Sequence, residues 1–268
     1  MNRKSQNRET QFIIDSEFEE KAKKSFYDNY YTEMTDDGIR WRNFGAIEKC
    51  KSILELCNGL KINKAVDIGA GPCSILLRLD KIKFASEYYV LEVSPSIVHF
   101  IREKISIPRL KAVYLLDTSK TPFDNNFFDL GILSHVLEHV TNPLKLLSET
   151  LRICEYVVLE VPLEDCLFAN MYWKFIEKIT GHKRGDNPIG HINFFNKSSI
   201  RKLVKASGGI ILKDRTYRLW KTYFFFPSKS QIITMFHLFK SVISYLIFKM
   251  TKSRLVSAHY TMLIRQKL

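Results

Sequence analysis

After Asn58-Gly59, short apolar runs rich in β-branched residues alternate with stretches whose apolar positions repeat at helical spacing. The runs predicted as strands are Ala65–Ile68, Tyr88–Val93, Ala112–Leu116, Leu130–Leu133 and Tyr156–Val161, with helices such as Ser74–Leu79, Ser96–Lys104 and Asn142–Arg152 between them. This alternation is typical of an α/β protein with a doubly wound, mostly parallel sheet. Two further strands are predicted at Ile210–Tyr217 and Ala258–Arg265, and the last of them would complete a seven-stranded sheet.

Two helical segments accompany this pattern. Residues 17–60 are predicted to be helical and to end at Asn58-Gly59; their apolar stripe comprises Phe44, Ile47, Ile53, Leu54 and Leu56. Ser230–Met250 forms a second helix, in which Thr234, His237, Ser241 and Ser244 make a narrow polar stripe among apolar residues. The expected organisation is a helical cap (1–60), a core (61–217), an aromatic and basic helical insertion (218–256) and a closing strand (257–268).

The composition fits a folded globular protein, with 268 residues of which 46% are hydrophobic and 26% charged. The five cysteines are odd in number, widely spaced and without a CxxC pair, which argues against a disulfide framework and a zinc finger. We expect buried thiols in a reducing compartment. Because the first ten residues are polar and show no apolar core of a secretory signal, a cytoplasmic location is expected.

Positive charge is concentrated in the last quarter of the chain. Residues 201–268 contain 14 Lys and Arg against the single acid Asp214, whereas residues 1–200 contain 27 of each sign. A cationic face attracts the phosphates of nucleic acid, anionic lipid or a phosphorylated substrate. The alternative is a solvated surface that only aids solubility.

The apolar segment Ser230–Met250 lies within this basic quarter. Lys240 stands in its middle, and its apolar stretch is short for a membrane span. We therefore expect a helix that caps the substrate side of the sheet or one that lies in a membrane interface; an ordinary buried helix is the alternative. Aromatic residues between 220 and 226, interleaved with basic ones, favour peripheral contact through 218–254 at the inner membrane face.

The sharpest motif is Val66-Asp67-Ile68-Gly69-Ala70-Gly71, which leads from the first strand into a helix. Glycines at such a turn let the backbone approach a ligand, and the helix amino terminus offers N–H groups. Glu92 ends the second strand, 23 residues after Gly69, where a carboxylate can accept both hydroxyls of a ribose. Leu116-Asp117-Thr118 ends the third strand and could bind an adenine amino group.

With these three elements in register, the chain resembles the class I S-adenosylmethionine-dependent methyltransferases from about Ala65 to Arg152, and more loosely to Gly208. The resemblance includes the Asp-x-Gly-x-Gly loop, the segment PFDNNFFDL (122–130) and the block SHVLEHV (134–140), which is similar to the small-molecule branch. Cys73 stands where a third loop glycine is common. A nicotinamide-binding Rossmann fold is the alternative; the acid before the first glycine, the histidine block and an antiparallel closing strand argue against it.

The resemblance implies a Rossmann-like fold and S-adenosylmethionine as cofactor. Its methionine part would be lined by Asp67, Gly69, Ala70 and Gly71, its ribose by Glu92 with Val93, its adenine by Asp117 and Thr118, and its sulfonium by Ser134. The amino-terminal helix of such folds often closes over the cofactor. Tyr31, Arg40 and Trp41 are therefore candidates, with packing and surface charge as the alternative.

Methyl transfer from a sulfonium is an in-line displacement, so the protein mainly aligns the reactants and excludes water. A hydroxyl acceptor also needs a general base or a metal, whereas an amine needs less. The spacing of His135, Glu138 and His139 predicts one face of a helix beside the cofactor, and His191 could approach the same mouth. We predict His135, His139 and His191 as the catalytic residues.

The same four side chains would suit a divalent ion. Related branches, among them the ubiquinone-pathway O-methyltransferases and the small-RNA 2′-O-methyltransferases, have an acid at the first position and bind a metal there, but this chain has His135. We favour an arrangement without metal, in which Glu138 and His139 fix the helix and only His135 faces the substrate.

The acceptor is expected to be a small molecule, and molecules that carry phosphate are among the candidates. The Glu-His-Val block, Val161-Pro162 and the segment GHINFF (190–195) look like methyltransferases of bacterial surface-polysaccharide pathways, whose substrates are sugars on nucleotide or polyprenyl-phosphate carriers. Two alternatives are an RNA methyltransferase that uses the basic quarter and a non-catalytic adaptor that keeps the fold. No nucleic-acid-binding module is visible, so nucleic acid is the less favoured partner.

Overall fold

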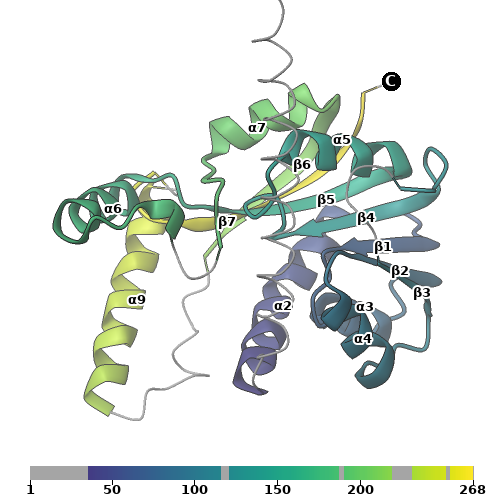
Figure 1. Cartoon of the computed structure of the whole chain (residues 1–268), viewed down its shortest axis with the longest axis horizontal. Coiled ribbons are helices and arrows are strands. Elements are labelled where there is room, and N and C mark those ends of the chain that lie inside the picture. Colours follow the sequence, from purple (N-terminus) through teal and green to yellow (C-terminus); the bar gives the residue numbers. More distant parts are fainter. Residues whose placement is uncertain (1–35, 116–120, 187–189, 219–230, 252–253, 268) are drawn as a thin grey trace, which may run out of the picture.

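The computed structural model describes residues 36–115, 121–186, 190–218, 231–251 and 254–267. One seven-stranded sheet has the order β3-β2-β1-β4-β5-β7-β6 (Figure 1). Its strands are β1 (Lys64–Ile68), β2 (Glu87–Glu92), β3 (Leu110–Leu115), β4 (Phe128–Ser134), β5 (Cys154–Leu163), β6 (Gly209–Tyr217) and β7 (Ala258–Gln266). β1 to β5 pair in parallel, and β7 runs antiparallel to both of its neighbours. The predicted α/β fold class is confirmed, and each predicted strand lies within two residues of an observed one.

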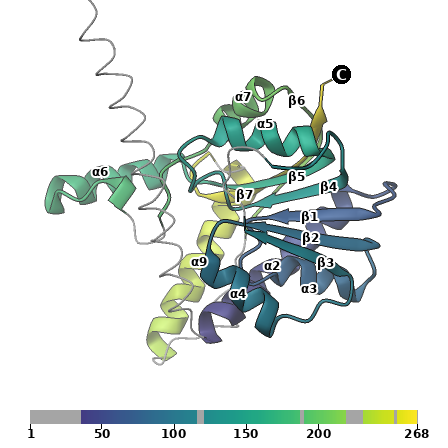
Figure 2. The same ribbon diagram turned by 45° about the vertical axis from the view of Figure 1, so that its right-hand side comes forward.

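Helices cover both faces of the sheet (Figures 1 and 2). α2 (Asp36–Leu56), α3 (Ser74–Lys81) and α4 (Pro95–Lys104) pack on one face, while α5 (Pro143–Ile153) and α7 (Lys197–Ala206) pack on the other. Successive strand residues therefore enter different cores: Ala65 and Val158 join the first, and Val66, Val157 and Leu159 the second. Burial on both faces explains why these strands are continuous apolar runs.

Local capping fixes the start of three helices. Ser94, Asn142 and Asn196 accept hydrogen bonds from Ile97 N, Lys145 N and Ser199 N, respectively, at the first turns of α4, α5 and α7. Pro95 and Pro143 follow the first two caps, where a missing N–H costs nothing. These side-chain signals are local in sequence, which is why the predicted and observed starts of α4 and α5 agree to within one residue; the sequence pattern did not lead us to predict α7.

The predicted apolar stripe of α2 is partly wrong. Ile53 and Leu56 are buried as expected, but Ile47 and Leu54 are 44% and 40% exposed. Ala46 and Cys50 take their place, because the helix packs on α3 through small side chains: the Cys50 thiol donates to Ile75 O at 3.6 Å. The predicted part of this helix before residue 36 lies outside the described residues.

All five cysteines are buried and free, as the sequence predicted. Burial raises the pKa of the Cys50 and Cys57 thiols to about 12, so neither is a thiolate near neutral pH. They act as small apolar core residues.

Two helices, α6 (Leu167–Thr180) and α9 (Gln231–Thr251), extend away from the sheet (Figures 1 and 2). α9 confirms the helix predicted at Ser230–Met250, whereas the sequence pattern did not lead us to predict α6. Leu167 N and Phe168 N donate to Arg254 O and Leu255 O at 3.1 Å, so the start of α6 lies beside the segment that follows α9. Within the described residues, no helix is long and apolar enough to cross a membrane.

Candidate active site

A cavity of about 680 Å³ lies at the carboxyl ends of the parallel strands, where the strand order reverses between β1 and β4. Ligands of open α/β sheets bind at this kind of switch point. Side chains of α2, including Trp41, Arg42 and Lys49, line one wall, and residues after β1, β2, β4 and β5 line the others.

The glycine loop forms the turn from β1 into α3. Gly69 has φ +73°, its N–H donates to Leu91 O at 2.9 Å, and a Cβ there would lie 2.6 Å from a methyl carbon of Val136. Cys73, in the position of the third glycine, also has a left-handed backbone, with φ 57°. The absence of a side chain at Gly69 allows Val136 to pack against the loop, and Gly69 and Ala70 line the cavity.

Two buried carboxyl groups face this loop. Glu92 Oε1 accepts from Gly71 N at 2.6 Å and Oε2 accepts from Val93 N at 3.1 Å. Burial raises the pKa of Glu92, and burial together with Glu92 raises that of Asp67 to about 7. Asp67 Oδ2 is buried and accepts no hydrogen bond from the described residues. The two groups fit a ligand rich in hydroxyl and amino donors, which S-adenosylmethionine is.

The other predicted cofactor residues fall into two groups. Ala70, Val93 and Ser134 line the cavity together with Asp67, Gly69 and Glu92. Of the amino-terminal candidates, Trp41 also lines it, but Arg40 forms an exposed ion pair with Asp37 at 3.2 Å instead. Tyr31, Asp117 and Thr118 lie outside the described residues.

The block after β4 is a turn, and the predicted helix is wrong. His135 adopts φ 59°, residues 137–139 form a turn, and α5 starts only at Pro143. Asn193 holds this turn by donating to Leu137 O at 2.9 Å and to Val140 O at 2.7 Å. Without helical geometry, the spacing of the histidines no longer places them on one face, and they join two clusters that are linked by the contact between His135 and Glu138.

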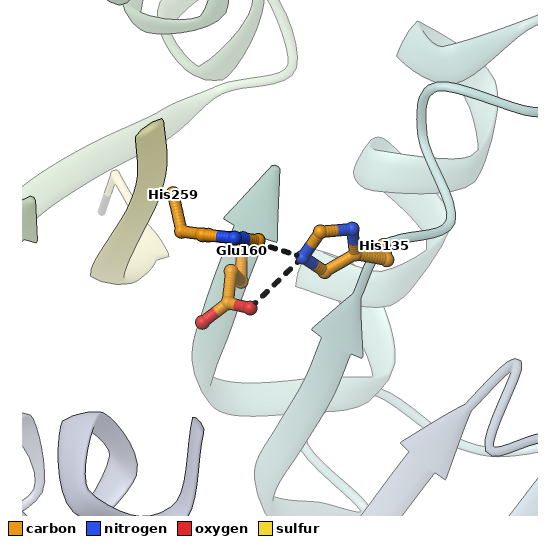
Figure 3. A group of neighbouring side chains, drawn as sticks. All are labelled: His135, Glu160 and His259. Atoms are coloured by element: carbon orange, nitrogen blue, oxygen red, sulfur yellow. Dashed lines mark hydrogen bonds and ion pairs between the residues drawn. The ribbon is translucent and has the colours of Figure 1, made fainter. Parts of the chain in front are cut away.

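The first cluster joins His135, which follows β4, Glu160 inside β5 and His259 at the start of β7 (Figure 3). His135 Nε2 lies 3.1 Å from both Glu160 Oε1 and His259 Nδ1. Glu160 also accepts from Tyr217 Oη at 3.1 Å and Thr261 Oγ1 at 2.8 Å, and Lys49 Nζ is 3.9 Å away. These donors occupy the carboxylate, and the Lys49 cation beside it disfavours a metal ion here.

The protonation of this cluster follows from its contacts. Burial and Lys49 oppose a charge on His135, but Glu138 and Glu160 outweigh them and raise its pKa. His135 Nδ1 lies 3.0 Å from Glu138 Oε1, so the ring stands between two carboxylates. Burial and His135 lower the pKa of His259 to about 3. A protonated His135 has no lone pair with which to accept a proton from a substrate.

The second cluster joins Glu138, His139 and His191, whose ligand atoms lie within 4.8 Å of one another. His139 Nδ1 is 3.2 Å from Gly190 O and His191 Nδ1 is 2.8 Å from Glu164 Oε2. Both acceptors fix the Nδ1–H tautomer. Burial lowers the pKa of His139, which therefore stays neutral near pH 7.

This second donor set fits a divalent cation. Glu138 is fully buried; its Oε1 lies 3.0 Å from His135 Nδ1, and neither of its oxygens accepts an aligned hydrogen bond from the described residues. A carbonyl and a carboxylate hold the Nδ1 atoms of the two imidazoles, which is the usual support for histidine ligands. His135, predicted as a fourth ligand, lies in the other cluster.

Three residues of these clusters escaped the sequence analysis: Glu160, Glu164 and His259. Two of them left a signal. Glu160 interrupts the apolar run of β5, and a charge inside a buried strand requires partners. Glu164 directly follows the carboxyl end of that strand, close to the position that Glu92 holds as the last residue of β2. His259 left none, because a histidine near a strand start is common.

The sheet order, the antiparallel β7, the glycine loop and the acid ending β2 together define a class I methyltransferase fold. In agreement, residues 66–156 match the family model described as a methyltransferase domain. The match over these residues and the fold together indicate an enzyme.

Solved structures with the same fold carry different activities in their descriptions. An S-adenosylmethionine-dependent methyltransferase from Archaeoglobus fulgidus is 15% identical, with a TM-score of 0.53, 84% of this chain and 94% of that chain covered. Geranyl diphosphate C-methyltransferase from Streptomyces coelicolor A3(2) is 11% identical, with a TM-score of 0.55; the alignment covers 82% of this chain and 79% of that one. The [4+2]-cyclase SpnF is 14% identical, with a TM-score of 0.55; the alignment covers 82% of this chain and 81% of that one. No curated protein sequence matches the chain. At these identities the likeness shows the fold alone.

Proposed function

We propose that the protein transfers a methyl group from S-adenosylmethionine to a hydroxyl group of a small polar acceptor, namely a sugar or a lipid-linked glycan precursor. The pair of His191 and Glu164 carries this proposal, because it lines the same cavity as the glycine loop. An imidazole that donates Nδ1–H to a carboxylate is oriented as a general base. A hydroxyl acceptor needs such a base, and an amine does not.

Bound S-adenosylmethionine supplies a methyl group on an electrophilic sulfonium. Asp67, Glu92 and the glycine loop would hold it, with Trp41, Arg42 and Lys49 of α2 on the facing wall. His191 Nε2 would take the proton of the acceptor hydroxyl, whose oxygen would accept the methyl group while S-adenosylhomocysteine leaves. Glu164 keeps the ring oriented and stabilises the imidazolium that forms.

The polar lining also supports an acceptor rich in hydroxyls and carrying phosphate. His139, His259 and Arg218 line the cavity, with Lys49 and Arg42 on the α2 wall. Arg218 Nη1 donates to Ser257 O, which holds its guanidinium at the cavity edge. Guanidinium and ammonium groups are the usual partners of phosphate.

A divalent cation is a second means of activating the hydroxyl, favoured by the buried oxygens of Glu138. Glu138, His139 and His191 would hold it, and it would lower the pKa of a bound hydroxyl. The base arrangement uses the observed contact between His191 and Glu164 without any added ion, so we favour it.

The test is transfer of labelled methyl to a panel of nucleotide sugars and polyprenyl-linked sugars. His191→Ala should lower kcat by about 100-fold or more while calorimetric affinity for S-adenosylhomocysteine stays unchanged, because the defect is in the chemical step. His99→Ala, on the exposed face of α4, is the matched control. Unchanged turnover in His191→Ala, or methylation of RNA but of no sugar, would contradict the proposal.

Chelation separates the two means of activation. Full activity after treatment with EDTA supports His191 as the base. Loss of activity that Mg²⁺ or Mn²⁺ restores would instead assign the second cluster to a metal.

A further inference from the structure

The helices α6 and α9 each present a stripe of large apolar side chains to solvent. On α6 the exposed residues are Leu167, Phe168, Met171, Tyr172, Phe175 and Ile179, and on α9 they are Met235, Phe239, Val242, Ile243, Leu246 and Met250. Phe175 is 61% and Phe239 66% exposed. α6 contains no buried residue at all, so packing on the protein cannot account for its apolar side chains.

The spacing shows that each stripe is one face of its helix. Positions 168, 171, 172, 175 and 179 follow the three-and-four-residue repeat of an amphipathic helix, and so do positions 235, 239, 242, 246 and 250. Of the other exposed large apolar side chains of the described residues, Trp41, Ile47 and Leu54 lie six and seven residues apart on α2, and the rest, such as Ile82, stand singly. Contiguous exposed apolar faces indicate an interaction surface, whereas scattered residues do not.

The two helices meet next to the cavity. The hydrogen bonds from Leu167 N and Phe168 N to residues 254 and 255 join the start of α6 to the segment after α9. Glu164, three residues before α6, and Ser257, two residues beyond Leu255, both line the cavity. Figures 1 and 2 show the two helices leaving the sheet from this shared corner.

The charged residues on and beside α6 and α9 indicate which kind of partner covers the two apolar faces. Among the described residues, α6 carries Lys174 and Lys178 against the single acid Glu177, and Lys249 and Arg254 stand at and after the end of α9 without an acid. Two copies of this surface would bring like charges together, which opposes self-association. An anionic bilayer offers apolar acyl chains next to negative headgroups and matches both features.

We propose that α6 and α9 dock the protein on an anionic lipid membrane, with both helices lying in the headgroup region. Their apolar faces enter the acyl boundary while the flanking Lys and Arg side chains meet lipid phosphates. This membrane docking does not depend on which reaction the protein catalyses. Only its corollary, that the cavity opens beside the bilayer toward a lipid-linked acceptor, rests on the proposed function.

Cosedimentation with vesicles of phosphatidylglycerol and phosphatidylcholine tests the proposal on the full chain. We expect binding that weakens with added salt. It should also fall by about tenfold in Phe175→Ser and in Phe239→Ser, because each change removes an aromatic side chain that enters the bilayer when the protein docks. Vesicles of pure phosphatidylcholine should bind more weakly. Ile82→Ser, at an exposed residue after α3, is the matched control and should bind like the unchanged protein.

Thermal melting confirms that the exposed-site variants fold. The proposal fails if the protein does not bind anionic vesicles, or if binding depends on salt but not on Phe175 and Phe239. It also fails if sedimentation shows a dimer that Phe239→Ser dissociates, which would make the surface a contact between copies. Methyl transfer to a soluble acceptor by Phe175→Ser and Phe239→Ser should be unchanged, so failure of docking and failure of the proposed reaction are distinguishable.

Discussion

Glu160 illustrates how a single buried charge organises the site. Its carboxylate lies inside an apolar strand and is 2% exposed, yet its pKa is held well below the usual range because His135 and Lys49 outweigh the effect of burial. Tyr217 and Thr261 donate to it as well. A buried charge with this many donors is stable only as a complete network, so Glu160 fixes His135 in its left-handed position.

His191 and His135 show that residue type alone does not define a catalytic group. Both histidines contact carboxylates, but His135 contacts one through each ring nitrogen, whereas the contact of His191 with Glu164 runs through Nδ1. Of the three histidines predicted as catalytic, His191 has the geometry of a base. His139 stands beside it, with ring centroids 4.7 Å apart.

Glu92 is expected to provide most of the polar affinity for the cofactor. Replacing it with Ala removes the carboxylate that would accept both ribose hydroxyls, and charge-assisted contacts of this kind contribute on the order of 2–4 kcal/mol. Titration calorimetry with S-adenosylhomocysteine measures the loss. Glu155→Ala, at an exposed position on β5, is the control. Unchanged affinity in a folded Glu92→Ala variant would refute the assignment.

At the scale of elements, the glycine loop and the turn after β4 are interdependent. Gly69 approaches Val136 so closely that a side chain does not fit, and Val136 is positioned by the turn that Asn193 holds. The cofactor loop and the acceptor-side histidines are therefore parts of one packed unit. A shift in either one moves the other.

Gly69→Ala should destabilise the fold by about 2–4 kcal/mol, because the left-handed backbone and the 2.6 Å approach to Val136 act together. Urea denaturation measures the change. Gly45→Ala is the matched control: it lies in helix α2 with no described atom within 4 Å of an added Cβ, so it should raise stability by roughly 0.5–1 kcal/mol. Equal stability of the two variants would show that the close approach is relieved at no cost.

At the scale of the whole molecule, the cavity is assembled from segments across the chain. Trp41 and Lys49 come from α2, Asp67 from β1, and Ala258 and His259 from the last strand. A ligand bound there contacts both ends of the described chain. Binding should therefore stabilise the complete fold rather than one subdomain.

S-adenosylhomocysteine at about 100 times its Kd should raise the free energy of unfolding by roughly 2.7 kcal/mol, equivalent to a rise in Tm of about 5–10 °C. Differential scanning calorimetry measures the shift, and the Glu92→Ala variant at the same concentration should show a smaller one. A single shifted transition agrees with the expectation. A transition that splits, with one part unaffected by the ligand, would contradict it.

The sequence by itself determined the strands, the starts of α3, α4 and α5, and the positions of the glycine loop and Glu92 beside the cavity. These features depend on local signals: continuous apolar runs, capping residues before Pro95 and Pro143, and glycines followed by an acid at a strand end. Glu92 and the loop were therefore placed correctly before any tertiary contact was known.

Only the tertiary structure decided how the histidines are divided. Helical spacing grouped His135 with His139, but the left-handed backbone of His135 sends the two rings to different clusters. The partner of His135 is His259, 124 residues away, and the partner of His191 is Glu164 on another strand end. A periodic pattern reports the neighbours of a residue along its own element, whereas these contacts exist because distant strands end at one edge of the sheet.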